Sequence, residues 1–192
     1  MELDFPPVFN GVDYLASAVD LLTANPVGPR ELEYAVLHIH AAAEVLFKAR
    51  LQQEHWSLVF DDPRRATRRS FESGNFTSCT SSDTVTRFRE IAQITLDVDD
   101  QNVLKCLGSD RNALHHYGLT HNARAVESRA GQALHFLDRF LGDELLPQMD
   151  EEEMRSFPWT LRRKINKGLG SIRAYRTERG KRLRGTLKGV AT

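Results

Sequence analysis

The chain has 192 residues and a mass of 21.8 kDa, the size of one domain or of one domain with an appendage. Hydrophobic residues make up 41% and charged residues 27%, a composition that predicts a folded globular protein and excludes a disordered one. No apolar run approaches the roughly 18 residues of a membrane span, and we find no secretory signal and only two cysteines, so we expect a cytoplasmic protein without membrane contact.

The formal net charge of zero hides an uneven distribution. Residues 1–159 contain 15 Lys/Arg and 25 Asp/Glu, a net charge of −10, whereas residues 160–192 contain 11 Lys/Arg and one acidic residue, a net charge of +10. This asymmetry is typical of a basic tail that binds nucleic acid or an acidic partner. It is equally consistent with a basic helix face that pairs with the acidic body of the same protein.

Apolar residues recur at helical spacing in the first half of the chain. We expect a first helix over residues 11–24 and a second from Pro29 to about residue 53, because proline suits the first position of a helix. An acidic pair before Pro63 predicts a short basic helix over residues 63–72. The composition of residues 73–82 predicts a loop.

Helical patterns continue in the second half. Ser81 or Ser82 can cap a helix that contains Phe88, and a pair of aspartates can open another, over residues 99 to about 118. A long amphipathic helix is expected after Asn122 as far as residue 146.

The C-terminal part, residues 150–188, has a weaker helical pattern that is interrupted by Pro158, Gly168 and Gly170. No segment alternates as a β-strand does. The predicted fold class is therefore all-α, a bundle of four to five long helices with short extra helices.

Motifs for metal and nucleotide sites are missing from the sequence. His38 and His40 are two residues apart, which points them in different directions on a helix, and neither an HExxH nor a CxxC motif occurs. The glycine-rich motifs of dinucleotide and P-loop sites and the GxSxG motif of hydrolases are also missing. We therefore expect neither a metal nor a cofactor.

A cluster of polar and basic residues at the expected end of a helix carries the strongest chemical signal. It reads Arg111-Asn112-Ala-Leu-His115-His116-Tyr117, followed by a glycine. A histidine can move a proton near neutral pH, and an arginine can stabilise the extra charge on a pentavalent phosphorus. If the substrate is RNA, its 2′-hydroxyl supplies the nucleophile.

The spacing of this cluster resembles the RX4-6H motif of HEPN domains, with Arg111 and His116 as the pair. It is close to the RX4HXY pattern of HepT toxins but departs from it, because Tyr117 follows His116 directly. Taking His115 as the motif histidine restores the tyrosine spacing and leaves the arginine–histidine spacing one residue short. A second likeness lies upstream, where the stretch with Glu44 and Lys48 resembles the second helix of many HEPN proteins.

Two other arginine–histidine pairs fit the RX4-6H spacing, Arg50–His55 and Arg129–His135. Neither has the asparagine, tyrosine and glycine that accompany Arg111. The resemblance covers about residues 10–146. We therefore expect a HEPN-like helical domain over residues 1–149 and a basic helical extension over residues 150–192.

The resemblance implies a metal-independent endoribonuclease that acts as a homodimer, with two motifs facing each other across an RNA-binding cleft. Arg111 would hold the scissile phosphate, Asn112 would orient either the arginine or the phosphate, and His116 or His115 would move the proton. Cleavage by 2′-hydroxyl attack would leave a 2′,3′-cyclic phosphate. Related proteins serve in toxin–antitoxin and phage-defence systems, which implies an antitoxin or another defence protein as a partner. Further contacts to the RNA would come from Tyr117, Glu44 and Lys48.

These residues also have ordinary structural interpretations. Arg111 can pair with Asp110 or Asp97, and Glu44 can pair with Lys48 one helical turn away. In a regular helix His115 shares the face of Arg111, whereas position 116 is rotated by about 140° from it. The alternative function is a non-catalytic HEPN-like module that binds RNA or a partner protein through the basic C-terminal segment.

Overall fold

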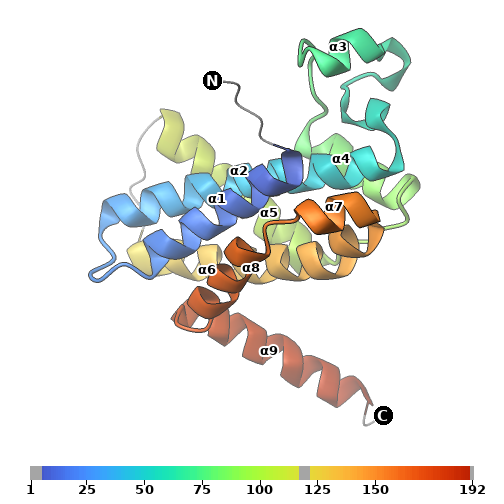
Figure 1. The fold of residues 1–192 in the computed structure, drawn as a ribbon. Helices are drawn as coiled ribbons and strands as arrows, with labels where there is room; N and C mark the ends of the chain where they lie inside the picture. Colours follow the sequence, from blue (N-terminus) through green and yellow to red (C-terminus); the bar gives the residue numbers. More distant parts are fainter. Residues whose placement is uncertain (1–5, 117–121, 191–192) are drawn as a thin grey trace.

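A computed structural model describes residues 6–116 and 122–190, without the side chains of residues 115–116 and 185–190. The described residues are 79% helical and contain no β-strand, only an isolated bridge between Phe60 and Ser78, so the predicted all-α class is confirmed. In this part of the chain the α-helices, shown in Figure 1, are α1 (Pro7–Leu22), α2 (Pro29–Glu54), α3 (Arg68–Glu72), α4 (Ser81–Glu90), α5 (Val98–His116), α6 (Ala123–Phe140), α7 (Glu151–Ser156), α8 (Trp159–Leu169) and α9 (Arg173–Val190).

Helix α2 is the centre of the bundle and contacts α1, α4, α5 and α6. Its apolar stripe is fully buried at Ile39, Leu46 and Leu51. Edge-to-face aromatic contacts join it to its neighbours, since the Phe47 ring lies 5.5 Å from that of Phe88 on α4 and 4.8 Å from that of Phe140 on α6. This packing fixes the position of α4 and α6 relative to α2.

Two of the expected helix starts differ in the structure. Helix α4 is capped by Thr80, whose Oγ1 accepts a hydrogen bond from the Asp83 backbone at 3.1 Å, while Asp83 accepts one from the Thr80 backbone at 2.9 Å. The prediction that Ser81 or Ser82 caps it is therefore wrong. The expected helix over 63–72 is split into a 3-10 turn, Pro63–Arg65, and α3, because Thr67 starts a new cap.

Other boundaries match the sequence pattern more closely. The first helix begins at Pro7, earlier than expected, whereas α2 begins at Pro29 as predicted. Helix α6 begins directly after Asn122, as predicted, and the Asn122 side chain caps it by accepting a hydrogen bond from the Arg124 backbone at 2.9 Å. Helix α6 continues as a π turn, Leu141–Leu145, and a short 3-10 turn that contains Pro147.

The basic C-terminal segment packs on the bundle. Helix α8 lies against α1, and the first half of α9 lies against α6, while the second half of α9 runs away from the bundle (Figure 1). Ile165 and Tyr175 are buried. At the α6–α9 crossing a side chain on Gly131 would come within 2.7 Å of the Tyr175 backbone nitrogen, so the two helices are in close contact. No helix in the described part of the chain combines the length and the apolar character of a membrane span.

Candidate functional site

A groove of about 660 Å³ lies between α2, α4 and α5. His40 and Glu44 line it from α2, Asn112 lines it from α5, and several hydroxyl and amide side chains line it from α4 and the start of α5. Glu44 and Asn112 were both predicted as site residues from the sequence. The fold therefore brings together two members of the predicted set that lie far apart in the chain.

Arg111 lies next to the groove on α5. It is half-buried, and its Nη1 donates a hydrogen bond to Asn112 Oδ1 at 3.0 Å. Neither predicted carboxylate pairs with it, because Asp110 is held by Arg129 at 2.6 Å and Asp97 by Arg182 at 2.5 Å. Within the described residues Arg111 has no carboxylate partner, so its positive charge is not neutralised by an ion pair and it can bind an anion.

His40 is a site residue that the sequence analysis missed. Burial lowers the pKa of His40, the Glu44 carboxylate raises it, and the positive charges of Arg111 and Lys48 lower it again. The net result is a pKa below the ordinary value of 6.5, so the imidazole is neutral at pH 7 and can accept a proton. The signal available in the sequence was the spacing of His40 and Glu44, which places them on one helical face.

Glu44 and Lys48 do not form the expected ion pair. Lys48 Nζ instead donates to Ser78 Oγ at 2.9 Å, which ties α2 to the loop before α4. Glu44 is exposed on the groove wall. A substrate contact from Lys48 stays a prediction.

The side chains of His115 and His116, and the whole of Tyr117, lie outside the described residues. The backbone of α5 is helical through position 116. Position 115 is therefore one helical turn beyond Arg111 on the same side of α5. The roles predicted for the two histidines and the tyrosine stay predictions.

The two other matches to the motif have structural roles. Arg50 is buried and pairs with Glu54 at 2.8 Å, and His55 caps the turn that follows α2. Arg129 makes two hydrogen bonds to Asp110, at 2.6 and 2.9 Å. His135 is buried, and its ring lies 5.6 Å from that of Tyr175. Of the three motif arginines, Arg111 is thus the one without a carboxylate partner in the described part of the chain.

Part of the basic C-terminal segment pairs with the acidic body. Arg162 binds Asp138, Lys164 binds Asp20 at 2.5 Å, and Arg182 binds both Asp97 and Asp100. For these three cations the interpretation of a basic face that docks on the protein itself is the correct one. Other cations of α8 and α9 are exposed and make no ion pair with a carboxylate in the described residues: Arg163, Lys167, Arg173, Arg176, Arg179 and Arg184.

Among the side chains that the structure describes, which exclude those of His115 and His116, no group of three or more His, Cys, Asp or Glu is arranged to hold a metal ion. Comparisons of the chain with protein-family models, with curated proteins and with solved structures found no match. The likeness to HEPN domains stays a prediction from the sequence motif.

Proposed function

We propose that the chain is an endoribonuclease of HEPN type that cleaves RNA beside the groove between α2, α4 and α5. The observation that carries the proposal is the state of Arg111, a half-buried arginine without a carboxylate partner in the described residues. The positive charge of Arg111 on α5 also helps to lower the pKa of His40 on the neighbouring helix α2. An unneutralised guanidinium near a neutral imidazole suits the binding and activation of a phosphodiester.

In the proposed reaction the 2′-hydroxyl of the RNA attacks the adjacent phosphorus. The 5′-oxygen leaves, and the products are a 2′,3′-cyclic phosphate and a 5′-hydroxyl. Arg111 stabilises the charge that builds up on the phosphate oxygens, and Asn112 holds the guanidinium in place. One histidine takes the proton of the 2′-hydroxyl and another protonates the leaving oxygen. His40 is suited to the first role, and His116 or His115 to the second.

The proposed enzyme needs no metal because the substrate supplies its own nucleophile. The resemblance supports a homodimer with the two motifs facing each other, acting in a toxin–antitoxin or phage-defence system with an antitoxin or another defence protein as partner. Cross-linking or sedimentation of the full chain tests the homodimer separately from the chemistry.

A cleavage assay in excess EDTA tests the proposal on total RNA and transfer RNA. We expect Arg111→Ala to slow cleavage about 100-fold, the usual effect of removing a group that stabilises the transition state. His40→Gln and His116→Ala should also slow it. Arg155→Ala on α7 removes the same charge away from the groove and should cleave as the wild type does. Equal cleavage by Arg111→Ala and the wild type would refute the proposal.

A second function, a non-catalytic module that binds RNA, is favoured by the exposed cations of α8 and α9. It predicts that the chain binds RNA without cleaving it and that the binding weakens as the salt concentration rises. Each cation removed, as in Arg173→Ala or Arg176→Ala, should lower the slope of log affinity against log salt concentration by about one phosphate contact. Point variants are better than removal of the segment, because Ile165 and Tyr175 belong to the core. Binding that survives these changes would exclude this function.

A further inference from the structure

The groove between α2, α4 and α5 carries a free carboxylate, that of Glu44 on α2. A lysine one helical turn further on, as Lys48 is, usually pairs with such a glutamate. Lys48 Nζ instead donates to Ser78 Oγ at 2.9 Å. Arg89, which lines the groove from α4, pairs with Glu90 at 2.6 Å. Among the described residues Glu44 has no ion-pair partner, so both of its oxygens can accept hydrogen bonds from a ligand.

Gly108 on α5 leaves open space in the same groove. A glycine inside a helix is less stable than an alanine would be. Contacts with neighbouring helices do not require this glycine, because a Cβ atom on it would meet no atom within 4 Å. Gly131 and Gly168 differ, since a Cβ atom there would collide with Ala174 and Val19. The space above Gly108 is therefore available to a ligand.

Apolar side chains form the inner wall of the groove: Phe47, Val85, Leu104 and Leu107. The groove volume of about 660 Å³ is in the range of sites for small organic ligands. Single-stranded RNA is commonly recognised through unstacked bases, whose faces pack on side chains and whose edges form hydrogen bonds. An apolar wall beside open space and a free carboxylate suits a planar base with donors on its edge.

The two oxygens of the Glu44 carboxylate favour one of the four RNA bases. The Watson–Crick edge of guanine presents two adjacent donors, the ring N–H and the amino group, which match both oxygens of one carboxylate. Adenine and cytosine place a ring-nitrogen acceptor beside their amino group, and uracil flanks its N–H with two carbonyl oxygens. Each of these acceptors would face the carboxylate with a like partial charge. The groove therefore favours guanine.

The phosphate of the same nucleotide can lie toward Arg111. Glu44 is one helical turn, about 6 Å along α2, beyond His40. Arg111 lies close enough to His40 to lower its pKa, and Arg111 donates to Asn112 on the groove wall at 3.0 Å. A nucleotide spans a similar length between its base and its phosphate. The groove thus offers a carboxylate for the base and a guanidinium for the phosphate.

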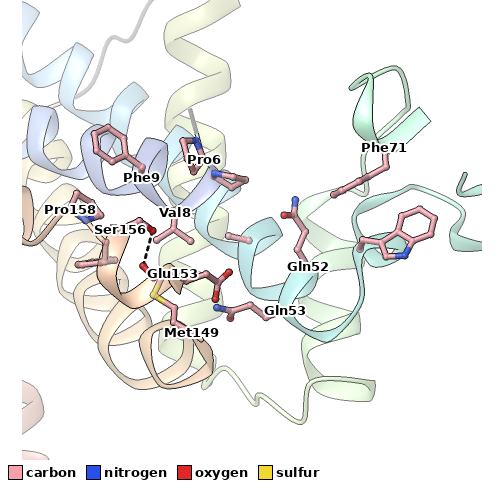
Figure 2. Close-up of a pocket in the computed structure, with 14 residues that line it drawn as sticks. Pro6, Val8, Phe9, Gln52, Gln53, Phe71, Met149, Glu153, Ser156 and Pro158 are labelled. Atoms are coloured by element: carbon pink, nitrogen blue, oxygen red, sulfur yellow. Dashed lines mark hydrogen bonds between the residues drawn. The ribbon is translucent and has the colours of Figure 1, made fainter. Parts of the chain in front are cut away.

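A second cavity, of about 350 Å³, lies where the start of α1, the end of α2 and α7 meet (Figure 2). Its walls are mostly apolar, and two of its polar side chains form hydrogen bonds within the fold. Gln53 Nε2 donates to the Leu145 carbonyl at 3.3 Å, and Glu153 accepts from the Asp150 backbone at 3.0 Å as part of the cap of α7. Of the two glutamates, Glu44 in the groove is the one with both oxygens free for a ligand.

We propose that the groove is a site for a guanine base and that Glu44 is the residue that selects it. The ring lies over Gly108 against the apolar wall, and its N–H and amino group donate to the two oxygens of Glu44. The link to RNA rests on the ribonuclease activity proposed above. A guanosine held at Glu44 would place its phosphate near Arg111, so cleavage should occur beside guanosine.

Calorimetric titration of the full chain with mononucleotides tests the base site without requiring cleavage. The probes are GMP, AMP, CMP, UMP and inosine monophosphate, which lacks only the amino group of guanine. Glu44→Gln removes the charge and keeps the shape, and Gly108→Leu fills the open space and removes no polar group. Their matched controls lie outside the groove: Glu33→Gln on the exposed side of α2, and Gly180→Leu on α9, where a side chain also meets no atom within 4 Å.

Binding is the better measurement because Glu44 also raises the pKa of His40, so Glu44→Gln would change the cleavage rate for a second reason. We expect GMP to bind more tightly than AMP, CMP and UMP. Inosine monophosphate should bind about tenfold more weakly than GMP, and Glu44→Gln should weaken GMP binding about 30-fold, since hydrogen bonds to a charged group are lost. Gly108→Leu should abolish binding without lowering the melting temperature, because leucine is the better helix former. Both control variants should bind GMP as the wild type does.

The proposal is overturned if GMP does not bind, if it binds no more tightly than AMP, or if folded Glu44→Gln retains the wild-type affinity. Mapping of the RNA cleavage sites separates this proposal from the ribonuclease proposal. GMP binding that depends on Glu44, without any RNA cleavage, would support the guanine site and refute the ribonuclease. Cleavage that depends on Arg111 but shows no preference for guanosine would support the ribonuclease and refute selection by Glu44.

Discussion

Asp100 at the start of α5 holds three helices together, and Asp100→Asn tests whether the basic C-terminal segment is docked by ion pairs. One carboxylate oxygen accepts from Arg139 on α6 at 2.6 Å, and the other from Arg182 on α9 at 2.8 Å. The Asp100 side chain is only 6% exposed. The asparagine side chain of this variant would keep the shape of the aspartate. It would lack the negative charge that binds both arginines.

The expected cost follows from the burial of the three side chains. Removing one partner of a fully buried ion pair costs about 3–5 kcal/mol. Here the two arginines are 39% and 25% exposed, so water replaces part of what is lost. Arg182 also keeps its bond to Asp97 at 2.5 Å. We expect Asp100→Asn to lower the free energy of unfolding by about 2 kcal/mol, and the melting temperature by roughly 4–8 °C.

Urea unfolding of the wild type, Asp100→Asn, Arg182→Gln and the double variant measures the coupling between the two side chains. We expect the double variant to lose less stability than the sum of the single variants. Asp97→Asn is the control, because the Asp97 side chain is 50% exposed and its pair should contribute only about 0.5 kcal/mol. Additive losses, with no coupling, would show that α9 is not held by this pair and would refute the docking interpretation.

Three further predictions concern single positions. Burial lowers the pKa of His135, and the positive charge of Arg139 lowers it further. The unfolded chain therefore binds a proton on His135 more tightly than the folded chain does, and the free energy of unfolding should fall as the pH drops below about 6.5. In urea titrations His135→Gln should reduce that fall. Gly131→Ala should lower the free energy of unfolding by about 1–2 kcal/mol, because the added carbon meets α9, and an unchanged melting temperature would contradict this. Thr80→Ala should cost about 1 kcal/mol through loss of the α4 cap, whereas Ser82→Ala should cost close to nothing.

The sequence predicts best those features that depend on neighbouring residues. Pro29 and Asn122 mark two helix starts correctly, because a proline at the first turn and an asparagine cap act within one turn of the chain. The start of α4 was missed because three consecutive hydroxyl residues, 80–82, can each act as a cap. The choice falls on Thr80, since only there does Asp83 stand at the third helical position and complete the capping box.

Features that depend on packing between distant segments could not be predicted. His40 was assigned no role, because its approach to Arg111 depends on the contact between α2 and α5. An ion pair between Asp110 and the adjacent Arg111 was one structural interpretation of the sequence, but consecutive residues on a helix point about 100° apart. The antiparallel neighbour α6 instead places Arg129 opposite Asp110, and Arg111 is left without that partner.

The ion pairs of the three motif arginines separate Arg111 from Arg50 and Arg129, which the motif spacing alone does not do. Arg129 must give up two hydrogen bonds to Asp110 before it can bind a phosphate, whereas Arg111 contacts a neutral amide oxygen and keeps its full charge. Arg129→Ala should therefore lower the free energy of unfolding by about 2 kcal/mol and leave RNA cleavage by the folded protein unchanged. Arg111→Ala should cost less than about 0.5 kcal/mol, because Arg111 makes no ion pair with a carboxylate in the described residues, and it should slow cleavage about 100-fold. If Arg111→Ala proves as destabilising as Arg129→Ala, then Arg111 has a structural role, and the observation that supports the ribonuclease proposal is lost.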